Sequence, residues 1–202
     1  MTLAAASLSV TGCAHSGSDS EVAAFEANLA AHASATAALQ LWCDQRGIAP
    51  GSAITVEFVS GADALPPEEI RGTLGVGAGA PLGYRHVRLV CGTAVLSEAH
   101  NWYVPARLTP EMNRLLETTD TPFGVVVKGL GYRRRTLSSE VLFRPLPADW
   151  DTLPRPQETP GATFVIPPEI LRHRAVLSTP DGQAFSLVQE TYTDQVLFRL
   201  AR

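Results

Sequence analysis

The sequence predicts an α+β domain built on a single antiparallel sheet of about six strands, with helices packed on one side. Two stretches have the alternation and turn residues of β-hairpins: residues 85–104, which turn at Cys91 and Gly92, and residues 172–192, which turn at 180–182. Helical segments are present, but they do not alternate strictly with the strands as they would in a doubly wound fold. We therefore expect an antiparallel core.

The composition is that of a globular protein. The chain has 202 residues, of which 45% are hydrophobic and 18% charged, so residues 21–202 are expected to form one domain with a proper core. The net charge of −4 argues against a general nucleic-acid-binding surface, although arginines cluster at 133–135 and 172–174. No segment approaches the ~18 consecutive apolar residues of a membrane span.

The first 20 residues have the character of a leader. Residues 10–13, Val-Thr-Gly-Cys, fit the bacterial lipobox, in which Cys13 is lipidated after cleavage and anchors the protein in the cell envelope. Against this, no Lys or Arg precedes Cys13, and the apolar run is short for a signal segment. If the segment is instead a start-site artefact, a cytoplasmic location is expected, and both alternatives stay open.

The alanine-rich stretch 22–46 predicts helix. Ser34 leaves two alternatives: one continuous helix, or a break at which Ser34 caps a second helix. Gly47 is suited to end the helix that runs to residue 46. Residues 54–59 alternate and predict the first strand.

The rest of the chain outside the hairpins contains loops, one strand and two helix starts. Residues 60–83 predict a loop with at most one helical turn at 67–71, residues 131–143 a strand, and the proline-rich stretch 145–168 a long surface connection. Thr109 and Pro110 are typical of a helix N-cap and first position.

A second helix start follows within a few residues. Asp120 or Thr121 can cap a short segment, 123–127, with Pro122 in its first turn. Backbone N–H groups at such a start are free to bind an anion.

Together these features carry a family resemblance. The arginine-bearing hairpin, the strand end at Val104–Pro105, the linking helix and the stretch 121–124, Thr-Pro-Phe-Gly, resemble the chorismate lyase family, whose members convert chorismate into 4-hydroxybenzoate and pyruvate. The likeness continues at 185–190 and, more faintly, at 34–36. It implies the chorismate lyase-like fold and a carbon–oxygen lyase of ubiquinone biosynthesis. It also implies a small aromatic or cyclohexadiene carboxylate as ligand, with no metal and no cofactor.

The resemblance implies an arginine that holds the ring carboxylate, since a guanidinium fork pairs two oxygens at once. Arg85 and Arg88 are the candidates, and being three residues apart on one strand they point to opposite faces. Counting back from Pro105 favours Arg88, and an ungapped count falls on His86, which shares a face with Arg88. We predict Arg88 as the substrate-binding and catalytic arginine, with Arg85 as the alternative.

The same resemblance assigns an acidic residue and a backbone cradle. Glu190 is expected near the ring oxygen that becomes the phenol, as a catalytic residue, although a turn one residue longer than the family's keeps Gln189 open. Backbone groups of Ala35, Phe123 and Gly124 are expected to complete the carboxylate site.

The second strand of the first hairpin carries a polar and aromatic cluster that is richer than the comparable family segment. Glu98, Asn101 and Trp102 are predicted to contact the ligand. His100 with Glu98 is either an acid–base pair on one face or a structural histidine.

A rival hypothesis is a non-catalytic binding protein for a small aromatic acid on the same fold, like the effector domains of some bacterial transcription regulators. An envelope lipoprotein would rarely meet chorismate, so lipidation at Cys13 would favour the binder. Cys43 and Cys91 are expected to be buried free thiols unless the chain is exported, in which case they could form a disulfide.

Overall fold

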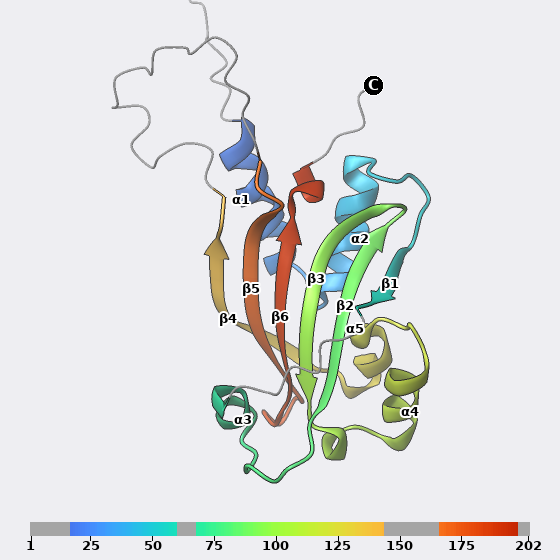
Figure 1. Cartoon of the computed structure of the whole chain (residues 1–202), viewed down its shortest axis with the longest axis vertical. Helices are drawn as coiled ribbons and strands as arrows, with labels where there is room; N and C mark the ends of the chain where they lie inside the picture. Colours follow the sequence, from blue (N-terminus) through green and yellow to red (C-terminus); the bar gives the residue numbers. More distant parts are fainter. Residues whose placement is uncertain (1–16, 60–67, 144–165, 198–202) are drawn as a thin grey trace, which may run out of the picture.

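The computed structural model describes residues 17–59, 68–143 and 166–197. These residues form one six-stranded antiparallel sheet in the order β1-β2-β3-β6-β5-β4 (Figure 1), which confirms the predicted fold class. The strands are β1 Ile54–Phe58, β2 Gly83–Cys91, β3 Ala94–Tyr103, β4 Arg133–Val141, β5 Glu169–Ser178 and β6 Ala184–Thr193. Cys13 and nearly all of the proline-rich stretch lie outside the described residues.

The helices fall between these strands and at the two ends of the described chain. They are α1 Gly17–Ala30, α2 Ala35–Arg46, α3 Glu68–Leu74, α4 Pro110–Thr118 and α5 Phe123–Val126, with 3-10 turns η1 Pro105–Arg107, η2 Val127–Leu130 and η3 Asp194–Leu197. None of the described helices is long and apolar enough to cross a membrane.

Both predicted hairpins form, β2–β3 and β5–β6. They are joined through the middle of the sheet, because β3 pairs with β6, while β1 and β4 lie at the edges. This arrangement places residues that are far apart in the sequence, such as Ala99 and Glu190, opposite one another.

The α1–α2 pair covers one face of the sheet and forms the larger core. Phe25 of α1 packs edge-on against Trp42 of α2 and Tyr192 of β6, each with ring centroids 5.0 Å apart. All three side chains are buried, and the indole N–H of Trp42 donates to the Val196 carbonyl at 2.9 Å. These contacts fix both helices to the sheet.

The break at Ser34 is present. Ser34 has extended backbone dihedrals, and its Oγ accepts a hydrogen bond from the Ala37 amide at 3.4 Å, so it is the N-cap of α2. Gly47 ends that helix in the left-handed conformation at φ 61°. The start of α2 therefore lies over the middle of the sheet instead of continuing α1.

Helix α4 begins as predicted, since Thr109 Oγ1 accepts from the Met112 amide at 3.2 Å and Pro110 takes the first position. Helix α5 also begins at Phe123, but its cap differs from the prediction. Pro122 occupies the N-cap position without a side-chain hydrogen bond, and the Thr121 hydroxyl accepts from that of Thr119 at 2.9 Å instead. The threonine thus stabilises the α4–α5 linker rather than the helix.

Helix α3 is longer than the single predicted turn and packs at the lower end of the opposite face of the sheet (Figure 1). Its Ile70 and Leu74 form a small core with Trp102 of β3 and Leu187 of β6. That core gives Trp102 a structural role.

Cys43 of α2 and Cys91 of β2 form a disulfide, with Cα atoms 6.5 Å apart. The expectation of two free thiols is therefore wrong for this structure. The cysteines are 48 positions apart, and they meet because α2 packs across the end of β2, which their spacing did not reveal.

A substitution at Gly83 can test how tightly the β2–β3 hairpin is packed. It lies opposite Tyr103, and a Cβ built on Gly83 would lie 2.2 Å from Cζ of that ring. Gly83→Ala should therefore destabilise the protein by about 1–3 kcal/mol in urea unfolding, because the ring must move. Gly72→Ala is the matched control: its Cβ would meet nothing within 4 Å, and alanine favours the helix by up to ~1 kcal/mol. Equal effects of the two substitutions would contradict this packing.

We predict that the stability of the fold depends on pH because of His173. It is buried on β5, where Ser139, Glu26, Glu190 and Arg134 face it. Burial lowers the pKa of His173, with Arg134 adding to that effect and the two glutamates opposing it.

The folded state thus binds the His173 proton less readily than the unfolded chain does. The resulting stability is present above the unfolded pKa, about 6.5, and is lost as pH falls through that value towards the folded pKa. We expect urea midpoints to fall on acidification, and His173→Gln to reduce the slope. An unchanged slope in the variant would show that another group is responsible.

Candidate functional site

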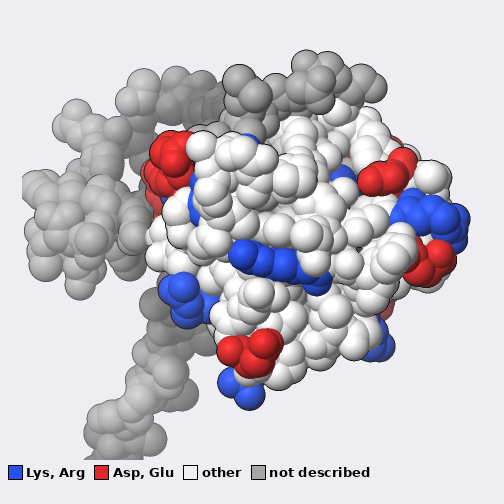
Figure 2. All heavy atoms as spheres, turned by 90° about the horizontal axis from the view of Figure 1, so that it is seen from below, with Lys and Arg blue, Asp and Glu red and all other residues white. Residues whose placement is uncertain are grey.

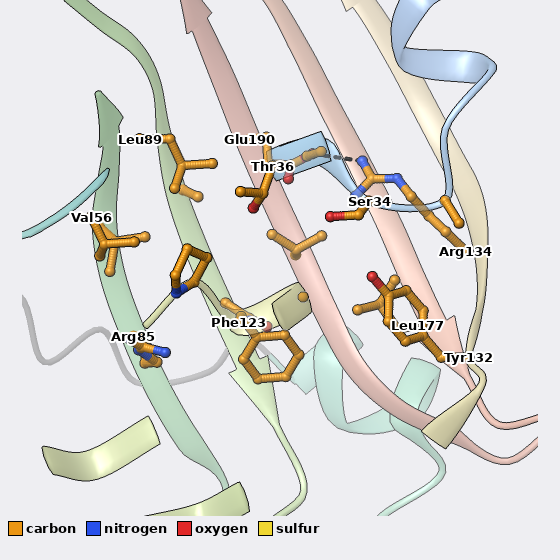
Figure 3. A pocket seen from close by; sticks show the side chains of 18 residues that line it. Ser34, Thr36, Val56, Arg85, Leu89, Phe123, Tyr132, Arg134, Leu177 and Glu190 are labelled. Carbon is orange, nitrogen blue, oxygen red and sulfur yellow. Dashed lines mark hydrogen bonds and ion pairs between the residues drawn. The ribbon is translucent and has the colours of Figure 1, made fainter. Parts of the chain in front are cut away.

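A pocket lies between the sheet and two helix starts, the segment 33–36 before α2 and the segment 122–124 at α5 (Figure 3). It encloses about 590 Å³ of space, its open mouth included. The part of its lining contributed by the sheet is largely apolar: Val56, Val87, Leu89, Ala99, Leu177 and Val188. Polar side chains lie around this apolar surface.

Arg85 lies at one side of the pocket, on β2. Its side chain is 5% exposed, and its guanidinium donates to the main-chain carbonyls of Thr121 at 3.1 Å and Thr119 at 3.2 Å. It also lies over the ring of Phe58, 4.9 Å from the centroid. Its Nε–H is buried without a hydrogen-bond partner.

The charge of Arg85 has no carboxylate partner within salt-bridge distance among the residues that the structure describes. Burial lowers the pKa of Arg85, and the more distant Tyr103 and Asp120 oppose that shift. An arginine remains protonated even so. The pocket therefore contains a buried cation whose hydrogen-bond acceptors are neutral main-chain carbonyls.

Arg134 lies on the other side of the pocket and has a partner (Figure 3). It forms an ion pair with Glu190 at 2.6 Å, and the two side chains are 11% and 6% exposed. Tyr192 donates its hydroxyl to the same carboxylate oxygen at 2.9 Å. Although burial opposes the charge of Arg134, Glu190 and Tyr192 raise its pKa above the usual value. Arg134 therefore has its charge partner within the pocket.

Gly124 permits the two helix starts to approach closely. A Cβ on Gly124 would lie 2.9 Å from Ser34 Oγ and 3.1 Å from the Tyr132 hydroxyl. Tyr132 is hydrogen-bonded to Ser34, and burial raises the pKa of its phenol. The wall of the pocket is thus built from three segments that meet at a glycine.

The structure brings together six of the predicted site residues. Those that line the pocket are Arg85, Ala35, Asn101, Phe123, Gly124 and Glu190. Asn101 is anchored on β3, where its side-chain oxygen accepts from Ser186 Oγ at 2.5 Å.

Arg88, Glu98 and Trp102 do not line this pocket. Arg88 is 45% exposed and donates from Nε to Glu98 at 3.0 Å on the opposite face of the sheet. The physical reason is strand alternation: Arg85, Val87 and Leu89 share the pocket face, which turns Arg88 away from it. The spacing count from Pro105 favoured Arg88, whereas Arg85 is the arginine that lines this pocket.

Arg134 and Tyr132 line the pocket, but the sequence did not indicate either of them as a site residue. Arg134 belongs to the arginine cluster 133–135, which resembles a solvated strand face, and Tyr132 precedes it at the start of β4. Strict alternation within β4 was the available signal, because it turns Arg134 inward between two exposed neighbours. No pattern in the sequence indicates that Arg134 pairs with Glu190, because the two residues are 56 positions apart.

No family model matches the sequence. A sequence relative does: the chain is 47% identical over 172 residues to the uncharacterized protein y4mC of Sinorhizobium fredii (strain NBRC 101917 / NGR234), a match that covers 85% of this chain and 73% of y4mC.

Solved structures share the fold at low sequence identity. PhnF from Mycobacterium smegmatis matches with a TM-score of 0.54 at 19% identity over 85% of this chain and 68% of PhnF. The effector domain of PhnF matches with a TM-score of 0.53 and 20% sequence identity. This match covers 80% of this chain and 89% of that domain. A possible transcriptional regulator, YydK from Bacillus subtilis, matches with a TM-score of 0.45 and 14% sequence identity. This match covers 75% of this chain and 64% of the length of YydK.

These neighbours correct the functional prediction. The fold is the chorismate lyase-like fold, as expected, and the effector domain of PhnF shares it. The prediction of a lyase that makes 4-hydroxybenzoate and pyruvate for ubiquinone biosynthesis is wrong. In the pocket, Glu190, the predicted catalytic acid, pairs with Arg134 and accepts a hydrogen bond from Tyr192.

Family membership rests on the sequence relative. At 47% identity over most of both proteins, this chain belongs to the same family as y4mC of Sinorhizobium fredii.

Proposed function

We propose that this domain binds a small organic anion in the pocket beside Arg85, as a ligand-binding effector-type domain and not as an enzyme. The single observation that carries the proposal is the buried guanidinium, which is 5% exposed and has an unpartnered Nε–H. Buried charges in proteins are normally paired, because an unpaired one loses its hydration without compensation.

The geometry of Arg85 supports a carboxylate as the missing partner. Two of its five N–H groups donate to the Thr119 and Thr121 carbonyls, which hold the guanidinium plane in place. The Nε–H remains without a partner, and a guanidinium can pair with the two oxygens of a carboxylate. The fixed plane lowers the entropy cost of binding.

The other residues that line the pocket indicate the chemistry of the rest of the ligand. The apolar surface between the charged side chains suits a short hydrocarbon body. The start of α2, a twelve-residue helix whose Ala35 and Thr36 line the pocket, adds a favourable dipole for negative charge. On the far side, the Glu190–Arg134 pair and Tyr132 offer hydrogen bonds to a polar group.

The name of one structural neighbour supports a sensing role. The effector domain of PhnF shares this fold. Among the pocket residues the structure describes, the one carboxylate, Glu190, is occupied by an ion pair. We therefore assign binding, not turnover, to this pocket.

Arg85 is the first test of this proposal. Acetate, succinate, benzoate and inorganic phosphate are screened by the shift in thermal unfolding, and the best binder is titrated calorimetrically. Arg85→Ala should lower its binding free energy by about 2–5 kcal/mol, because a carboxylate then enters the pocket without its cation. Arg85→Lys should restore only part of this, since an ammonium cannot reproduce the fork.

Arg88→Ala is the matched control for this test, because Arg88 lies on the same strand but on the opposite face. It should bind as the wild type does. Loss of binding in Arg88→Ala with retention in Arg85→Ala would overturn the assignment, and so would the absence of a shift with every one of the four anions.

Gly124 is the second test. Gly124→Ala places a methyl group against Ser34 and Tyr132, so it should weaken binding of the same anion by about 1–3 kcal/mol as the wall is displaced. Gly129→Ala is the control, since the nearest atom to its Cβ is Met112 Cε at 3.7 Å. Unaltered affinity in Gly124→Ala would show that the ligand does not depend on this wall.

A further inference from the structure

A second polar cluster lies on the face of the sheet opposite the pocket, where α3 covers only the lower end. It consists of His86 on β2 and Glu98 and His100 on β3. The register pairs His86 directly with His100, and Glu98 shares their face because it is two positions from His100. One potential ligand atom from each residue lies within 4.8 Å of the others.

We propose that His86, Glu98 and His100 form a binding site for a divalent transition-metal ion, with Zn²⁺ as the best fit. Two imidazoles and one carboxylate are the protein ligands of a well-known class of zinc sites, which leave a further position for water or another ligand. Imidazole nitrogen also suits Co²⁺ and Ni²⁺, so these ions can serve as probes.

Neighbouring side chains contact His100 and Glu98. The Tyr84 hydroxyl lies 2.8 Å from Nδ1 of His100, which leaves the Nε2 of that ring as the metal ligand. Arg88 holds one Glu98 oxygen at 3.0 Å, and the other lies 2.7 Å from His86 Nε2. Partners of this kind fix ligand tautomer and orientation in metal sites. Arg88 thus acts on this cluster and not on the pocket.

The cluster is partly shielded from solvent. The side chain of His86 is 9% exposed and that of Glu98 is 33% exposed, so the cluster is shielded on one side and open on the other.

The cluster has an alternative role as an aromatic stack. The rings of His86 and His100 lie nearly parallel, with centroids 4.1 Å apart and an interplanar angle of 20°, and Trp102 continues the row. Lone pairs of parallel rings do not converge, so a bound ion requires the imidazoles to turn about χ2. Metal binding should therefore change the environment of Trp102, which gives a second measurement.

The test uses chelator-treated protein and the metal alone. Co²⁺ is titrated while the visible absorption is recorded, Zn²⁺ is used to displace it, and Trp fluorescence is followed in parallel. We expect one equivalent of metal per chain. His86→Ala and His100→Ala should each weaken binding by more than the roughly 10–100-fold typical of an outer-shell change, and Tyr84→Phe should fall within that range.

Two controls separate this site from other sources of binding. His32→Gln removes a histidine whose Nδ1 lies 2.7 Å from the Asn28 carbonyl, away from this cluster, and should bind metal as the wild type does. Arg85→Ala should also keep the metal while losing the anion, so failure of one proposal is distinguishable from failure of the other. Circular dichroism establishes that each variant is folded.

Three results would overturn the proposal. They are less than one equivalent bound at saturation, metal affinity unaltered in both His86→Ala and His100→Ala, and equal weakening in the His32→Gln control. Any of them would leave the cluster as an aromatic and hydrogen-bonded stack.

Discussion

The pairing of β3 with β6 is the contact on which the rest of the structure depends, because it joins two local hairpins into one sheet. Each hairpin is fixed by a short turn, whereas this central pairing closes a long loop and has to be stabilised by the core beneath it. Phe25, Trp42 and Tyr192 supply that core directly over β6. The pocket is built on the same strand pair.

The sheet also fixes the electrostatics of the pocket. Arg85 is on β2, Glu190 is two strands away on β6, and Arg134 is on the edge strand β4. Both arginines are two strands from Glu190, so strand order alone does not choose between them. Glu190 pairs with Arg134. The Arg85 guanidinium donates instead to the Thr119 and Thr121 carbonyls of the linker between α4 and α5.

Charge on the outer surface follows a different pattern. In the view from below, Lys and Arg occur singly or beside Asp and Glu and do not gather into one basic patch (Figure 2). On the outer face of the sheet, Arg88 and Glu98 pair across the hairpin at 3.0 Å, and both are partly exposed. Such surface pairs contribute little stability. The two faces of one hairpin thus separate an unpaired buried charge from paired exposed ones.

Local features of the chain were predictable to the extent that their causes are local. The N-cap at Thr109 and the turns of both hairpins depend on neighbouring residues, and the structure has them where the sequence predicts them. At Ser34 the structure has the second of the two alternatives that the sequence left open. Features that need a distant partner were missed. The disulfide between Cys43 and Cys91 and the pair of Arg134 with Glu190 arise only after the sheet has assembled.

The sequence could not decide between Arg85 and Arg88 for a different reason. Alternation correctly placed them on opposite faces, but which face is buried depends on where α1, α2 and the α4–α5 linker pack. The two carbonyls that hold Arg85, those of Thr119 and Thr121, come from that linker, more than 30 positions away. A motif count along one strand contains no information about that contact.

Glu190 shows how the charges of the pocket are divided. Its carboxylate lies 2.6 Å from the Arg134 guanidinium and accepts a hydrogen bond from the Tyr192 hydroxyl at 2.9 Å. The position that the lyase resemblance selected is therefore already paired in this protein, while the Arg85 guanidinium is held by two main-chain carbonyls. The sheet sets where these side chains lie, and the segments packed on it decide which of them are paired.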